Sequence, residues 1–187
     1  MKKKIFIIHG WGGGPNEGWL AWLGKEFKDR GFDVVAPQMP NTDEPKIEEW
    51  IPFLSNLVGE PNQETYFIGH SIGCQTIMRY AETIYPKKVG KAVFVAGWFN
   101  LLNLEDEESY EIAKPWIETS IDFEKIKRIF ESAHVFLSNN DPWVPLTDKK
   151  IFEEKLGAKV IVEKNKGHFT EDNGIYEMPE ILEILEK

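Results

Sequence analysis

The chain has 187 residues and a net charge of −9, from 22 basic against 31 acidic residues. A chain of this length fits a single domain with a substantial core, and its 42% apolar content excludes disordered and fibrous classes. The acidic balance disfavours nucleic acid and anionic lipid surfaces as partners, because both carry dense negative charge.

The first predicted element is a short apolar strand, residues 5–8, which follows three lysines and ends at His9 and Gly10. This run is too short for the apolar core of a signal peptide. No stretch approaches the roughly 20 apolar residues of a membrane-spanning helix. The single cysteine, Cys74, cannot form an internal disulfide. We therefore expect a cytoplasmic protein with no membrane partner.

Further apolar runs of strand length alternate with amphipathic segments along the chain. The predicted strands are residues 5–8, 33–36, 65–68, 92–96, 135–137 and 160–162. The predicted helices are residues 19–30, 47–57, 72–85, 148–156 and 179–185, with hydrophobic side chains at helical spacing. This alternation predicts a single α/β domain over residues 1–187, in which helices cover both faces of a parallel sheet of about six strands.

Residues 98–132 interrupt the alternation, because they are acidic and aromatic and contain no strand-like run. They are expected to form one or two short helices inserted after the fourth strand, where an insertion can cap a pocket. The acidic run at residues 105–108 is interpreted as a solvated face.

A nucleophile motif follows the third predicted strand directly. Residues 69–73, Gly-His-Ser-Ile-Gly, fit G-x-S-x-G and lead into a predicted helix, which is the strand, tight turn and helix that the motif requires. Ser71 is then exposed at the carboxyl edge of the sheet, and the Ile72 N–H at the helix start becomes an oxyanion donor. The alternative is that Ser71 only caps the helix.

A glycine loop follows the first strand at residues 10–14. It is not a dinucleotide fingerprint, since Pro15 or Glu17 occupies the last glycine position, and it lacks the Gly-Lys-Ser/Thr of a phosphate loop. Neither kind of nucleotide-binding loop is therefore expected here. We interpret the segment as an oxyanion loop in which Trp11 or Gly12 presents a backbone N–H opposite that of Ile72. The alternative is a turn that only connects strand to helix.

A serine hydroxyl needs a general base, and His168 is the best placed of four histidines because it follows the last predicted strand. His9, His70 and His134 suit packing and backbone hydrogen bonding better. No histidine spacing indicates a metal site.

The acid that orients the base is predicted to be Asp141, in the loop after the fifth strand, which Pro142 and Pro145 stiffen. Glu105 and Asp106, after the fourth strand, are the rivals. A purely structural role for Asp141 would be an Asx turn. The chain order Ser71, Asp141, His168 is the order that the α/β-hydrolase fold uses.

With these motifs, the chain resembles the retinoblastoma-binding protein 9 family of small serine hydrolases, including its bacterial YdeN-like members. The resemblance rests on residues 9–12, 69–73, 138–142 and 167–169 and on the tryptophan-rich helix after the first loop. It implies a compact α/β-hydrolase fold with strand order 2-1-3-4-5-6, serine esterase or amidase-like activity and no cofactor. The family's pocket-protein motif, Leu-x-Cys-x-Glu, is absent around Cys74, so that partner is not expected.

Four tryptophans lie in or beside loops that are predicted to ring Ser71, and they are candidates for the lining of an acyl pocket: Trp11, Trp98, Trp116 and Trp143. The predicted reaction is hydrolysis of a small carboxylic ester, thioester or amide through an acyl-enzyme. Two other interpretations stay open, namely a catalytically silent fold that binds a protein partner and an acyltransferase.

Overall fold

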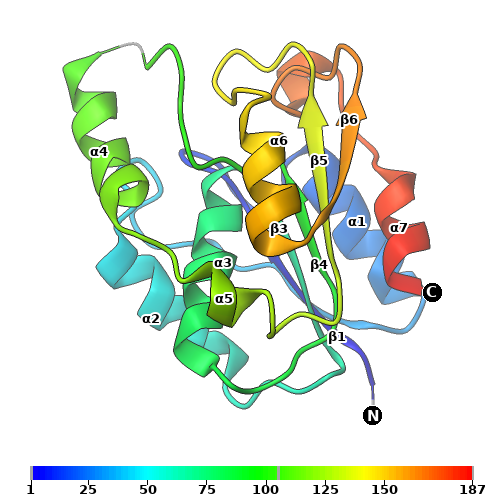
Figure 1. Cartoon of the computed structure of the whole chain (residues 1–187). Coiled ribbons are helices and arrows are strands. Elements are labelled where there is room, and N and C mark those ends of the chain that lie inside the picture. Colours follow the sequence, from blue (N-terminus) through cyan, green and yellow to red (C-terminus); the bar gives the residue numbers. More distant parts are fainter. Residues whose placement is uncertain (1, 105, 187) are drawn as a thin grey trace.

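The computed structural model describes residues 2–104 and 106–186, and it contains one parallel sheet of six strands (Figure 1). The strands are β1 (Lys4–Ile8), β2 (Asp33–Val35), β3 (Thr65–His70), β4 (Ala92–Val95), β5 (Ala133–Ser138) and β6 (Lys159–Glu163). Every neighbouring pair is parallel, and the order is β2-β1-β3-β4-β5-β6. The α/β fold class and the strand order 2-1-3-4-5-6 are thereby confirmed.

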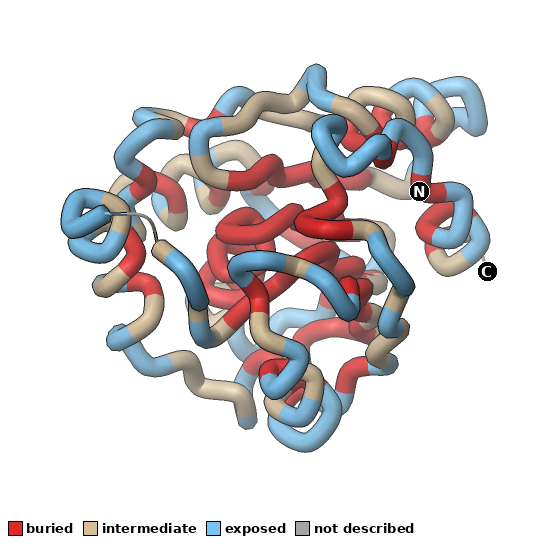
Figure 2. The backbone as a smooth tube through the Cα atoms, turned by 90° about the horizontal axis from the view of Figure 1, so that it is seen from above, coloured by how far each residue is buried: buried red, intermediate tan, exposed pale blue. Residues whose placement is uncertain are grey.

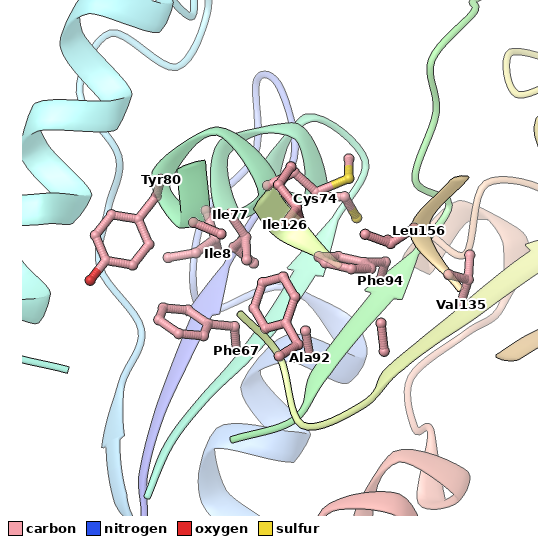
Figure 3. Packing of buried hydrophobic residues seen from close by; sticks show 14 of the residues in the cluster. Ile8, Phe67, Cys74, Ile77, Tyr80, Ala92, Phe94, Ile126, Val135 and Leu156 are labelled. Atoms are coloured by element: carbon pink, nitrogen blue, oxygen red, sulfur yellow. The ribbon is translucent and has the colours of Figure 1, made fainter. Parts of the chain in front are cut away.

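The central strands are apolar throughout because both faces of the sheet are covered. Successive side chains of a strand point to opposite faces, so Phe6 and Phe67 enter one core and Ile7 and Ile68 enter the other. Figure 3 shows the first of these cores, where Phe67 and Phe94 lie against the helix that carries Ile77.

The helices divide between the two faces of the sheet (Figure 1). One face is covered by α1 (Gly18–Asp29) and α7 (Pro179–Glu186), and the other by α2 (Ile47–Val58) and α3 (Ile72–Ile84). The predicted helix at residues 148–156 is α6 (Asp148–Ile151) continued by one π-helical stretch, η1 (Phe152–Leu156). Among the described residues, no helix is long and apolar enough to span a membrane.

Two short helices, α4 (Glu107–Glu118) and α5 (Phe123–Ile126), lie between β4 and β5, where the sequence predicted one or two. Asp106 caps α4 by accepting a hydrogen bond from the Ser109 N–H at 2.7 Å. Seen from above in Figure 2, the buried backbone lies at the centre and exposed segments surround it.

Candidate active site

Ser71 stands between β3 and α3 with φ 52° and ψ −121°, a backbone conformation that residues other than glycine rarely adopt. The turn is possible because glycines flank it: a Cβ at Gly69 would lie 2.8 Å from the Cys74 nitrogen, and one at Gly73 would lie 2.7 Å from the His9 carbonyl oxygen. The Ser71 side chain makes no capping hydrogen bond to α3. The capping alternative is therefore wrong, and the hydroxyl is left for other chemistry.

His168 and Asp141 form a buried pair at the carboxyl ends of β6 and β5. The His168 Nδ1 lies 2.8 Å from the Asp141 Oδ2, and the Asp141 side chain is 1% exposed. The other carboxylate oxygen, Oδ1, accepts the backbone N–H groups of Trp143 at 2.9 Å and Val144 at 3.1 Å. The Asx-turn interpretation and the pairing with His168 therefore both hold, each through a different oxygen.

The backbone of His168 is held by other side chains, among them His70, for which the sequence predicted packing and backbone hydrogen bonding. The His70 Nε2–H donates to the His168 carbonyl at 2.8 Å, and the Asn173 Oδ1 accepts the His168 N–H at 2.8 Å. One residue earlier, the Gly167 N–H donates to the Asn140 Oδ1 at 2.9 Å. Burial lowers the pKa of His70 to about 3, helped by the nearby His168 ring. His70 is thus a neutral hydrogen-bond donor that joins the serine turn to the histidine loop.

Ser71 and His168 line the same pocket, whose volume is about 420 Å³. Within the described chain, neither the Ser71 hydroxyl nor the His168 Nε2 has a hydrogen-bond partner. Hydrogen bonds between a nucleophile and its base are often long before substrate binds. The two residues therefore line one pocket without a hydrogen bond to each other in the described chain.

The two expected oxyanion donors of the glycine loop differ in whether their backbone N–H is already bonded. The Gly12 N–H donates to the Thr42 carbonyl at 2.8 Å, which removes Gly12 from the two expected oxyanion donors. The Trp11 N–H has no partner among the described residues, and Trp11 lines the pocket together with Ile72, the first residue of α3. Trp11 and Ile72 stay as the candidate donors.

His9 sets the geometry of the glycine loop. Its Nε2 accepts the Met39 N–H at 3.0 Å, so the proton of the neutral ring is on Nδ1, which donates to the Gly10 carbonyl at 2.7 Å. Burial lowers the pKa of His9, in agreement with a neutral ring. The expected structural role of this histidine is confirmed.

Three of the four candidate tryptophans line the pocket, namely Trp11, Trp98 and Trp143. The Trp143 ring stands edge-on to the His168 ring at 4.9 Å. The prediction for Trp116 is wrong: this side chain is 1% exposed, its Nε1–H donates to the Pro45 carbonyl at 2.8 Å, and it packs against Trp50. The Trp116 indole of α4 thus belongs to the hydrophobic core rather than to the pocket.

The segment after β4 supplies pocket residues that the sequence did not single out, Leu101 and Leu104, while Glu17 contributes a carboxylate from the start of α1. Burial, and then the charge of Glu171, raise the pKa of Glu17. No lysine or arginine lines the pocket in the described part of the chain.

The rival residues lie elsewhere. Asp106 is engaged as the cap of α4, and Glu105 lies outside the described residues. His134 is the second residue of β5 and so lies toward the amino end of that strand, away from the pocket.

Cys74 is buried as expected, and burial raises the pKa of its thiol. Across residues 2–104 and 106–186 there is no group of three or more histidine, cysteine, aspartate or glutamate side chains suited to a metal ion.

Comparison with known proteins gives consistent matches over nearly the whole chain. The family model for serine hydrolases matches residues 5–187. Serine hydrolase RBBP9 of Rattus norvegicus is 31% identical over 170 residues, which are 89% of this chain and 87% of that protein. YdeN of Bacillus subtilis (strain 168) is 28% identical over 186 residues, which are 99% of this chain and 95% of that protein.

Solved structures share the fold. The crystal structure of the ydeN gene product from B. subtilis has a TM-score of 0.89 at 27% identity, covering 98% of this chain and 97% of that chain. The esterase RhEst1 from Rhodococcus sp. ECU1013 has a TM-score of 0.66 at 13% identity, covering 100% of this chain and 91% of that one.

Proposed function

Because the chain belongs to the serine hydrolase family, as its motifs predicted, we propose that it hydrolyses small carboxylic esters with Ser71 as nucleophile, His168 as general base and Asp141 as the orienting acid. The observation that carries this proposal is the buried 2.8 Å contact between the His168 Nδ1 and the Asp141 Oδ2, in a pocket that His168 lines together with Ser71. No cofactor takes part in this reaction.

The first half-reaction forms an acyl-enzyme. The Ser71 Oγ attacks the ester carbonyl while the His168 Nε2 takes the hydroxyl proton, and Asp141 stabilises the resulting imidazolium through Nδ1–H. The oxyanion of the tetrahedral intermediate accepts hydrogen bonds from the Trp11 and Ile72 N–H groups, whose freedom from protein partners supports this role. The C–O bond to the alcohol then breaks, and the alcohol leaves with the proton from His168.

The second half-reaction uses water as the nucleophile. His168 takes a proton from water, the hydroxide attacks the acyl carbonyl, and the Ser71 Oγ leaves with the proton that His168 returns. The carboxylic acid product and the free enzyme result. The same steps apply to thioesters and amides.

The pocket supports uncharged acyl groups of modest size. Three tryptophans and two leucines supply much of its apolar lining, and its volume of about 420 Å³ lies at the small end for ligand pockets. Glu17 and the absence of lysine and arginine from the described lining disfavour anionic substrates, because a substrate carboxylate would be repelled by Glu17 and would have no lysine or arginine to pair with.

The test is covalent labelling followed by mass spectrometry. The wild-type chain is treated with a fluorophosphonate probe and a panel of activated esters, and a mass shift confined to Ser71 is expected. Ser71→Ala should not label, while Ser109→Ala, which removes another hydroxyl from the pocket lining, should label normally. A folded wild-type chain that the probe leaves unmodified would refute the proposal, as would labelling of Ser71→Ala.

A further inference from the structure

A second cavity lies along α3, beyond the nucleophile. Gln75 and Arg79 line it from α3, one and two turns after Ser71, and its volume is about 340 Å³. The insertion closes it through Asn100, Thr119 and Phe123, and Lys155 of η1 lines it as well. It shares none of its described lining residues with the active-site pocket.

Arg79 enters this cavity with most of its hydrogen-bonding capacity unused. The side chain is 5% exposed, and its Nη2 donates to the carbonyls of Trp116 at 2.8 Å and Thr119 at 2.9 Å. The buried Nε has no partner, and within the described residues the Nη1 group has none either. Three of the five N–H donors of the guanidinium therefore have no protein partner in the described chain, and one of them, on Nε, is fully buried.

In the described chain, no carboxylate forms an ion pair with the positively charged Arg79. No acidic oxygen of the described chain lies within 4 Å of the guanidinium. Burial lowers the pKa of Arg79, and the Glu82 carboxylate one turn away only partly opposes this. Glu82 itself accepts the Asp122 N–H at 2.9 Å. The carbonyls at the end of α4 supply only partial negative charge.

The rest of the lining extends this positive character. Lys155 lies over the Phe123 ring at 5.5 Å and makes no ion pair within the described chain, and no aspartate or glutamate lines the cavity there. The buried carboxylate of Asp148 accepts three hydrogen bonds from Phe99 and Asn100 at 2.6–2.8 Å. In a chain of net charge −9, this is a pocket with two cations and no lining acid.

We propose that this cavity is a binding site for one small oxyanion, a carboxylate or a phosphate, held by Arg79 and Lys155. A planar guanidinium with free donors binds such groups through charge-assisted hydrogen bonds. A hydroxyl on the ligand would in addition satisfy the buried Gln75 Oε1, which has no partner in the described chain. The site lies behind Trp98, whose carbonyl accepts the Gln75 Nε2–H at 2.5 Å.

The experiment is calorimetric titration of the full chain with sodium acetate and with inorganic phosphate, at neutral pH and at ionic strength held constant with chloride. Saturable binding of one anion per chain is expected for at least one of the two. Arg79→Met should weaken it by about tenfold or more, and Lys155→Met by several-fold. Arg128→Met, which removes an exposed arginine near α5, should leave the affinity unchanged.

The location of the bound anion is tested separately. Ser71→Ala should bind as tightly as the wild type, because the cavity does not include the active-site pocket. Loss of binding in Ser71→Ala, unchanged affinity in Lys155→Met, or absence of saturable binding to the wild-type chain would each overturn the proposal. Lys155→Met keeps the test decisive if Arg79→Met fails to fold, since Lys155 is not among the buried residues.

Discussion

Asp141→Asn tests whether the carboxylate fixes the proton of His168 on the correct nitrogen. In the native chain Oδ1 accepts two backbone N–H groups, from Trp143 and Val144, and Oδ2 faces the His168 Nδ1. An asparagine has one oxygen, and placing its amino group against the two N–H donors would cost about 1–3 kcal/mol for each lost hydrogen bond. The oxygen therefore stays on the backbone, and the amino group faces His168.

The consequence is a reversed tautomer. The asparagine amino group donates to Nδ1, which must then be unprotonated, so the ring proton moves to Nε2. A protonated Nε2 cannot accept the hydroxyl proton of Ser71. In Ser-His-Asp enzymes a tautomer reversal of this kind lowers kcat by about 10⁴, which is about 5.4 kcal/mol of transition-state stabilisation. The fold should be kept, because the backbone contacts of Oδ1 survive.

The assay is steady-state hydrolysis of an activated ester, with thermal unfolding of each variant measured in parallel. Asp106→Asn is the matched control, since it changes an aspartate that only caps α4 and should leave kcat unchanged. An Asp141→Asn variant that folds normally and retains kcat within about tenfold of the wild type would refute the reasoning.

Three further outcomes follow from the structure. Ser71→Gly should unfold at a higher temperature than Ser71→Ala, by about 2–4 °C for each kcal/mol of strain released at φ 52°; a lower melting temperature for the glycine variant would show that the turn is unstrained. Burial lowers the pKa of His70 to about 3 in the folded chain, so between about pH 3 and 6.5 the His70 ring is protonated only when the chain is unfolded. The free energy of unfolding of the wild type should therefore fall by up to about 1.4 kcal/mol for each pH unit as the pH falls through this range. The unfolding free energy of His70→Gln, measured with urea at several pH values, should lack this part of the pH dependence. Equal pH dependence in the variant and the wild type would contradict the prediction. Trp116→Phe should cost about 2 kcal/mol of stability, measured by urea unfolding, with kcat/KM unchanged, whereas Trp143→Phe should lower kcat/KM and leave stability nearly unchanged; the reverse pattern would refute their separate placements.

The sequence predicted the sheet well because the buried strands are short, apolar and bounded by polar turns. The same property located the candidate site. Ser71, Asp141 and His168 each follow a strand, and the carboxyl ends of parallel strands meet at one edge of the sheet. Local pattern was sufficient for these residues, since their position depends on strand order rather than on any particular contact.

Residues whose position depends on distant contacts could not be predicted in this way. The Gly12 N–H is occupied by the carbonyl of Thr42, which comes from a different loop. Trp116 is turned inward, where its ring packs against Trp50 of α2 and its Nε1–H donates to the Pro45 carbonyl. The His70 contact with the His168 carbonyl joins positions 98 residues apart. In each case the partner residue is distant in the sequence, so the local pattern around the residue does not predict the contact.

The candidate triad and part of the pocket lining belong to different parts of this chain. The candidate triad stands at the ends of β3, β5 and β6, whereas Trp98, Leu101 and Leu104 belong to the segment after β4. The two parts are joined by buried polar contacts, chiefly those of Gln75 with Trp98 and of Asp148 with Asn100. We therefore expect that replacing Leu101 or Leu104 by alanine changes the acyl preference in an ester panel while probe labelling of Ser71 continues. Equal loss of turnover for every ester would show instead that the segment supports the triad itself.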